Sequence, residues 1–130
     1  MDITVVKECT AASLAEQITF PEVVMKLAAA GVERYILDLV GKNKLTFGTQ
    51  GETHKAELAF DRVAIPVHLD AVAIKRTITD IQQGRIKYQT FLKQIMAAGC
   101  SHYEVFITGR KAIYFGRDGG QHIENFPNKS

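Results

Sequence analysis

The chain has 130 residues, 46% of them hydrophobic and 23% charged, which is the composition of one ordinary globular domain with a real core. The net charge of +2 combines residues 1–65, with 7 basic and 9 acidic side chains, and residues 66–130, with 9 and 5. This asymmetry reflects either drift between two solvated surfaces or attraction between two halves. The sequence contains no dense cluster of Lys and Arg residues, which argues against nucleic acid as a partner.

The sequence carries no pattern for export or membrane insertion. The start, MDITVVKECT, lacks the apolar core of a secretory signal, and no stretch approaches the roughly 20 apolar residues of a membrane span. Cys9 and Cys100 fit neither a zinc motif nor a disulfide framework, so we expect reduced thiols. These features predict a cytoplasmic protein with no membrane partner.

The first half of the chain begins with two predicted helices. The segment CTAASLAEQ predicts a short one, and TFPEVVMKLAAAG predicts a longer one because its apolar residues recur at helical spacing. Thr19 and Glu22 have the spacing of a capping box, and Gly31 follows where a helix ends in a left-handed residue.

Three strands are predicted after this helix. The alternation in RYILDLV predicts a strand whose Tyr35 faces inward. Turns at residues 41–43 and 48–51 then separate two further strands, and the last of these contains His54. The unit is therefore a helix followed by an antiparallel meander.

The segment VAIPVHLDAVAIKRTITDIQQG follows, with an apolar run and then a helix for which Asp70 is the candidate N-cap. After it the first pattern returns. AAAGVERY becomes AAGCSHY, and His54 is matched by His122, all at a constant offset of 68 positions. Self-similarity at one fixed period indicates an internal duplication.

The duplication predicts an α+β fold. Two helix-plus-antiparallel-meander units, about residues 8–60 and 70–127, are expected to form one domain over residues 1–130. We expect pseudo-twofold symmetry, with the helices packed on one face of the sheet. One unit alone would expose an apolar sheet face and open edges, so the two copies are expected to share a core.

The repeated segments also carry a family resemblance. FPEVVMKLAAAGVERY, IQQGRIKYQTFLKQIMAAGCSHYEVFITGRKAIYFGRDG and HIENFP resemble the YbcV-like proteins, a bacterial and prophage-associated family of unknown function with some members labelled phage envelope protein. The similarity covers most of the chain and is strongest over residues 81–127. The resemblance implies the fold and the compartment, and it implies no catalytic or binding residue.

The histidines are the candidate catalytic residues. His122 and Glu124 are two positions apart on a predicted strand, so the carboxylate could orient the imidazole for acid–base chemistry. His54 is equivalent to His122 by the repeat and could lie near it, with Tyr114 assisting. The alternative is that both histidines are hydrogen-bonded structural residues.

No cofactor or metal is predicted. His54, His122 and Glu124 include metal-ligand types, but they form no compact metal-binding motif. GKNKLTFG and GRKAIYFG are hairpin turns rather than strand-to-helix phosphate loops. Cys100 follows a helix C-terminus, where the dipole does not lower a thiol pKa, so we expect a buried structural cysteine.

The sheet face opposite Tyr35 is the candidate binding surface. The sequence assigns to it Ile36, Asp38, Val40, Thr46, Glu104, Phe106, Thr108 and Tyr114. Such a face is apolar for a solvent-exposed surface, which indicates a partner, a ligand groove or self-association. The alternative is that the two units pack these faces together as core. The candidate binding residues are Phe106, Tyr114, Glu104, Asp38 and Arg110.

The leading hypothesis is a small binding or protein-interaction module that uses the open sheet face or the seam between the repeats, with a homodimer or another protein as partner. A small enzyme based on His122 and Glu124 is the second hypothesis. A weak nucleic-acid binder is the third, resting on the basic second half with Arg110, Lys111 and Arg117 around its turns.

Overall fold

The computed structural model describes residues 1–127, and it contains the same series of elements twice. The first series comprises α1 (Ile3–Leu14), α2 (Phe20–Ala29), β1 (Val32–Asp38), β2 (Asn43–Gly48) and β3 (Thr53–Glu57). The second comprises α3 (Ala71–Gln82), α4 (Tyr88–Ala97), β4 (Cys100–Phe106), β5 (Lys111–Gly116) and β6 (Gln121–Asn125). Each element of the second series begins and ends 68 positions after its counterpart, as expected of duplicated units.

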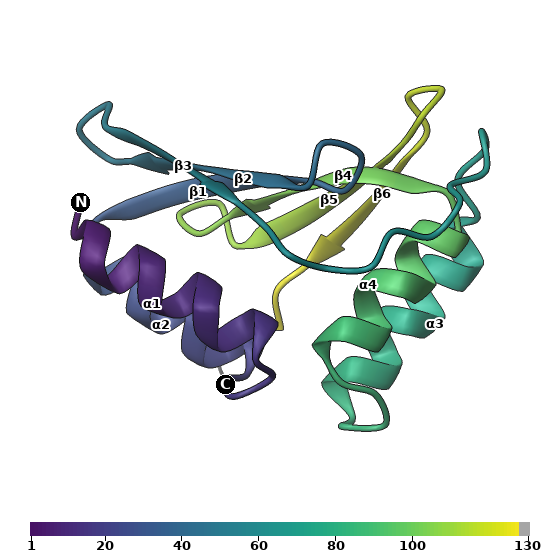
Figure 1. Cartoon of the computed structure of the whole chain (residues 1–130), viewed down its shortest axis with the longest axis horizontal. Helices are drawn as coiled ribbons and strands as arrows, with labels where there is room; N and C mark the ends of the chain where they lie inside the picture. The colour runs from purple at the N-terminus through teal and green to yellow at the C-terminus, as the bar shows by residue number, and fades with distance from the viewer. Residues whose placement is uncertain (128–130) are drawn as a thin grey trace.

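The six strands form one antiparallel sheet in the order β3-β2-β1-β4-β5-β6. The two units meet where β1 pairs with β4, so a pseudo-twofold axis passes through the centre of the sheet. Figure 1 shows α1 and α2 under one half of the sheet and α3 and α4 under the other. The predicted α+β fold, with its helices on one face, is confirmed.

The helix ends follow from local sequence. Thr19 forms the predicted capping box with Glu22, and its hydroxyl accepts the Glu22 backbone N–H at 3.4 Å. Asp70 caps α3 by accepting the backbone N–H of Ala73 at 3.0 Å. Gly31 follows α2 with φ of +84°, the left-handed value that glycine adopts without strain.

The first helix differs from its prediction. It begins at Ile3 rather than near Cys9, and with 12 residues it is as long as α3. Asp2 provides the start, because its side chain accepts the backbone N–H of Val5 at 3.3 Å, as Asp70 does for Ala73. The first repeated unit therefore begins further towards the N-terminus than its predicted start at about residue 8.

The core lies between the sheet and the four helices. Its fully buried side chains come from both units and include Leu27, Leu39, Ile74, Leu92 and Ile95. One contiguous cluster joins them, so the two copies share a core as expected. Among residues 1–127, no helix combines the length and apolar character needed to cross a bilayer.

The segment 58–70 joins the two units along one end of the sheet. Its Arg62 guanidinium donates to the Val40 carbonyl in the β1–β2 turn. Farther along, the Ile65 carbonyl accepts a hydrogen bond from Arg117 in the β5–β6 turn at 3.0 Å. The connection therefore contacts a turn of each unit (Figure 1).

Strand register assigns two residues to the opposite face from the one predicted. Thr46 lies directly opposite Tyr35, and Tyr114 lies directly opposite Tyr103, so both are on the helix-covered face, with exposed fractions of 1% and 7%. The physical reason is the hairpin loop. Asp38 pairs with Asn43, so outward positions are even-numbered in β1 and odd-numbered in β2.

Candidate functional site

The face of the sheet that carries no helix is the candidate site, and we call it the open face. It presents alternate residues of all six strands, the ones that do not point towards the core. Seven of them are apolar and only partly shielded from solvent: Ile36, Leu45, Phe47, Phe106, Ile113, Phe115 and Ile123. None of the seven packs against the core cluster.

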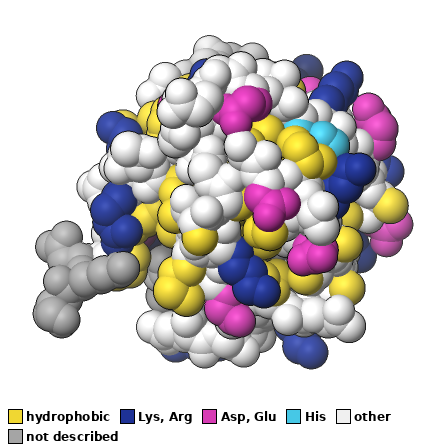
Figure 2. Space-filling view, turned by 90° about the vertical axis from the view of Figure 1, so that its left-hand side faces the viewer, with side chains coloured by type: hydrophobic (Ala, Val, Ile, Leu, Met, Phe, Trp, Pro, Cys, Tyr) yellow, Lys and Arg dark blue, Asp and Glu magenta, His cyan; other side chains and the backbone are white. Residues whose placement is uncertain are grey.

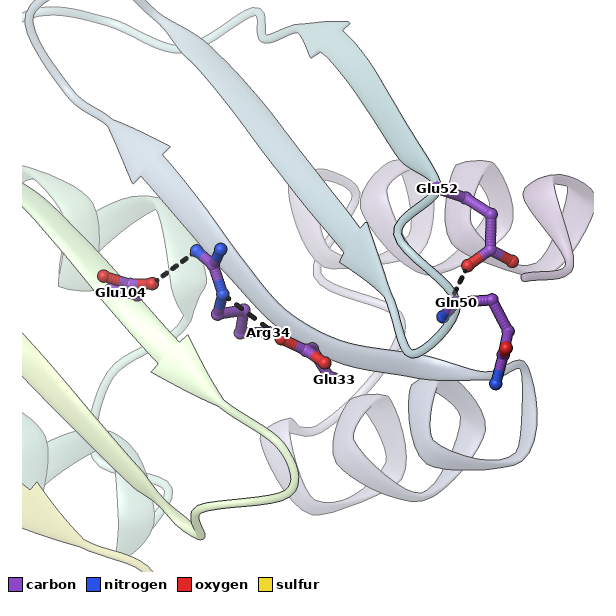
Figure 3. Close-up of polar contacts among 5 residues, drawn as sticks. All are labelled: Glu33, Arg34, Gln50, Glu52 and Glu104. Atoms are coloured by element: carbon purple, nitrogen blue, oxygen red, sulfur yellow. Dashed lines mark hydrogen bonds and ion pairs between the residues drawn. The ribbon is translucent and has the colours of Figure 1, made fainter.

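Arg34 is at the centre of the polar contacts on this face. Its guanidinium donates to the Glu104 carboxylate at 2.9 Å and lies 3.5 Å from Glu33 (Figure 3). It also stacks over the Phe47 ring at 3.7 Å. At the same end of this half of the sheet, Glu52 accepts the Gln50 backbone N–H at 2.9 Å and braces the β2–β3 turn (Figure 3). The Arg34–Glu104 contact crosses from the first unit to the second.

The second unit has a ring-on-ring stack at the equivalent position. His102 is equivalent to Arg34, and its ring stacks on Phe115 with 4.6 Å between centroids. Phe47 and Phe115 were not predicted as face residues because the register expected for the second strand of each hairpin was wrong. Arg34 and His102 were not predicted because the expected outward series on the first strand of each hairpin began only at Ile36 and Glu104. The length of the hairpin loop between Asp38 and Asn43, which form a pair, sets the register of the second strand and was the feature that could have given it.

Four predicted binding residues lie where the open face and its rim were expected. Glu104 and Phe106 are on β4, and Asp38 is on β1, where its side chain accepts the Val40 backbone N–H at 3.0 Å. Arg110 lies in the β4–β5 turn and donates to the Pro127 carbonyl at 3.3 Å. The fifth, Tyr114, is buried on the helix-covered face and is unavailable to a partner on the open face.

The His122–Glu124 pair is present on β6. His122 Nε2 lies 3.1 Å from Glu124 Oε1, and the Lys75 ammonium donates to Glu124 Oε2 at 2.7 Å. Burial raises the pKa of Glu124, but the hydrogen bonds from Lys75 and His122 outweigh it, so the pKa is lowered. Both carboxylate oxygens therefore already have partners within the chain.

His54 does not join this pair. It lies on β3, whereas His122 lies on β6, at the opposite edge of the sheet. Five strand spacings, on the order of 24 Å, separate the two edges. The expected approach of the two histidines is wrong, because the units pair through β1 and β4 and carry their third strands outward. Among residues 1–127, no group of three His, Cys, Asp or Glu side chains is placed to hold a metal ion.

The helix-covered face contains a buried lysine that sequence analysis did not single out. Lys44 is 5% exposed, donates to the Thr10 hydroxyl at 3.2 Å, and has its ammonium 4.3 Å from the centroid of the Tyr35 ring. Burial lowers the pKa of Lys44 to about 8. The equivalent residue of the second unit is Ala112. A lysine in one copy where the other copy has an alanine was the sequence feature that could have identified Lys44.

Two shallow grooves lie on the outer sides of the helix pairs. One is lined by α1 and α2 residues, including Asp2, Cys9 and Lys26, and the other by α3 and α4 residues, including Asp70 and Thr77. The grooves occupy equivalent places in the two units. Neither is lined by His54, His122 or Glu124, so the candidate acid–base residues do not line either groove.

Surface charge is mixed rather than concentrated. Figure 2, which views the molecule from the left of Figure 1, shows acidic and basic side chains interspersed among hydrophobic ones. Neither sign dominates this view. A stripe of positive charge, the usual footprint of nucleic-acid binding, is absent from it.

A family model described as "Protein of unknown function (DUF1398)" matches residues 43–124, from the start of β2 into β6. The matched segment covers more than half of the chain. No curated protein matches the sequence.

Proposed function

Given that this chain belongs to the DUF1398 family, whose description names no activity, we propose that it is a protein-interaction module that binds through the open face. The observation that carries the proposal is the set of seven apolar side chains outside the core. A sheet face that is to remain in water normally alternates apolar inward residues with polar outward ones. Here five of the six strands place one or two apolar side chains outward, among polar ones.

The organisation of the open face supports the same proposal. Its central row crosses the sheet as Lys55, Leu45, Ile36, Glu104, Ile113 and Ile123, which are directly opposite one another on neighbouring strands. Polar and charged residues lie mainly in the flanking rows and at the β3 edge. An apolar centre with a polar rim is the usual anatomy of a protein interface.

The catalytic alternative has less support. The His122–Glu124 pair has good hydrogen-bond geometry, but Lys75 occupies the second carboxylate oxygen. The pair also lies outside both helix-pair grooves. We therefore assign the pair a structural role that anchors β6 to α3.

Two narrower proposals come from the sequence. The similarity to YbcV-like, prophage-associated proteins is more specific than the DUF1398 match and stays a prediction. We also propose a cytoplasmic location, for which the free and buried Cys9 and Cys100 are the support.

Photo-cross-linking in the producing cells tests the interaction proposal. Benzoyl-phenylalanine replaces Phe47, Phe106 or Phe115 on the open face, or Met25, which is 60% exposed on α2, as a matched control. We expect an adduct identified by mass spectrometry from the open-face positions and none from Met25. Absence of any adduct from Phe47, Phe106 and Phe115 would overturn the proposal.

A further inference from the structure

The charges on the open face nearly cancel. Arg34, Lys55 and Lys111 are basic, and Glu33, Asp38, Glu57 and Glu104 are acidic. A partner with one dominant charge, such as nucleic acid, gains little from such a surface. A surface that contains both signs in nearly equal number can instead face a copy of itself with little net repulsion.

The positions of two of these charges favour self-association more specifically. Arg34 and Asp38 lie on β1, two positions before and two positions after Ile36, and all three point outward. A twofold axis that crosses β1 at Ile36, in the plane between two stacked sheets, places Arg34 of each copy opposite Asp38 of the other. Ile36 then packs against its own copy, and both charge pairs lie close to the axis. Glu104, which is directly opposite Ile36 in the same row, also faces its own copy, and the Arg34 guanidinium bonded to each Glu104 carboxylate offsets that repulsion.

The size of the open face fits a stable dimer. Six strands at about 4.8 Å spacing, with 5 to 7 residues each at about 3.3 Å, give a plan area of roughly 500 Å². Two copies therefore bury on the order of 1,000 Å² in plan, and more in accessible surface, which reaches the range of specific interfaces. Two sheets stacked about 10 Å apart also interdigitate their facing side chains, as β-sandwich cores do.

We propose that the partner of the open face is a second copy of this chain, which forms a face-to-face, twofold-symmetric dimer with two sheets inside and the helices of both copies outside. This inference rests on the proposed function and names its partner. In the dimer, the second copy covers the open face, as the four helices cover the other face of the sheet. The seven apolar side chains become a second core.

Sedimentation of the purified full chain tests the proposal. We expect the wild-type protein to sediment at twice its 14.4 kDa mass. Ile36→Lys should weaken association by roughly a hundredfold or more, because it removes an apolar contact from the axis and buries a charged lysine of each copy against that of the other. Val72→Lys is the control, since Val72 is 71% exposed on α3 and should leave the dimer intact. If Ile36→Lys does not fold, Ile123→Lys at the 52% exposed edge position replaces it.

A cysteine variant tests the axis itself. In Ile36→Cys, the two thiols face each other at the twofold axis, but sheets about 10 Å apart hold their Cα atoms too far apart for a direct disulfide. A short bismaleimide cross-linker should therefore give a covalent dimer of Ile36→Cys and none of Val72→Cys. The native Cys9 and Cys100 are buried and should remain inert. A wild-type dimer whose Ile36→Cys variant is not cross-linked, and which is unaffected by Ile36→Lys, would overturn the face-to-face arrangement.

The outcomes also separate this inference from the interaction proposal. The wild-type chain could stay monomeric at on the order of 100 μM and yet cross-link through Phe106 to a different, identified protein. That result would leave the interaction proposal standing and would overturn the proposal that the partner is a second copy. A monomer that instead binds a labelled single-stranded oligonucleotide in a salt-sensitive way, with binding lost in Ile36→Lys, also overturns it. A monomer with no open-face adduct in cells overturns both proposals.

Discussion

Ile36 and Glu104 occupy equivalent positions in the two units, and they also lie directly opposite each other in the β1–β4 pair. The pseudo-twofold axis of the chain therefore passes between an apolar and a charged side chain. Arg34 compensates for this mismatch by donating to the Glu104 carboxylate across the strand pair. The backbone is symmetric, and the chemistry that surrounds the axis is not.

Gly99 should be far less tolerant of substitution than Gly31. Both have positive φ, +95° and +84°, which disfavours any side chain. A Cβ at Gly99 would clash with the carbonyl oxygen of His68, whereas one at Gly31 would meet only Met1 atoms at 3.6 Å or more. We expect Gly31→Ala to cost about 1 kcal/mol and Gly99→Ala at least 2 kcal/mol, measured by urea unfolding. Equal costs would show that the clash relaxes freely.

Tyr88 and Tyr103 should show strong coupling. Their buried hydroxyls are 2.9 Å apart and bond to each other, and burial raises the pKa of Tyr88 to about 12. Tyr88→Phe or Tyr103→Phe leaves the other hydroxyl unpaired, at a cost of about 1 to 2 kcal/mol. The double variant removes both partners and should cost less than the sum. Strict additivity would mean that each lone hydroxyl finds another partner.

Glu124 should stabilise the fold in a pH-dependent way. Its pKa in the folded chain is lowered from 4.5, so its contribution is present above pH 4.5 and is lost as pH falls through the lower folded value. Glu124→Gln should cost about 1 kcal/mol at pH 7, and the difference from wild type should shrink in acid. Glu16→Gln, at an exposed position after α1 and away from the open face, is the control. A difference that is constant with pH would contradict the assignment.

The sequence predicted the scaffold because glycines, caps and alternation repeat in one register. Gly31 and Gly99 end helices, Asp70 and Thr19 begin them, and Tyr35 and Tyr103 face the core as expected. These features depend only on local contacts and on the constant offset of 68 positions between the two units.

The parts that were not predicted depend on long-range placement. The separation of His54 and His122 depends on which strands the two units use to pair, and strand pairing leaves no local signature. The assignment of Tyr114 and Thr46 depends on loop length, since a change of one residue moves every side chain to the other face. The predicted open face lacked Phe47 and Phe115 for the same reason.

The last prediction concerns Lys44, whose replacement should make the fold more stable although it removes a buried charged side chain. Its ammonium donates only to the Thr10 hydroxyl, and no carboxylate contacts it among residues 1–127. Burial lowers its pKa from 10.5 to about 8, so the folded chain binds fewer protons than the unfolded chain between these values. Stability therefore rises with pH across this window. Below pH 8 the full penalty applies, about 3 kcal/mol.

Lys44→Met removes that penalty while it keeps most of the side-chain volume. We expect the variant to be more stable than wild type by about 2 kcal/mol at pH 7, less than the full penalty because the bond to the Thr10 hydroxyl and the contact with the Tyr35 ring are lost. The gain should shrink between pH 8 and pH 10, where wild-type Lys44 becomes neutral on folding. Urea unfolding under reducing conditions at pH 7 and pH 9.5 measures both effects, with the exposed Lys7→Met on α1 as control. A variant less stable than wild type at pH 7 would show that the Thr10 and Tyr35 contacts outweigh the cost of burying the charge.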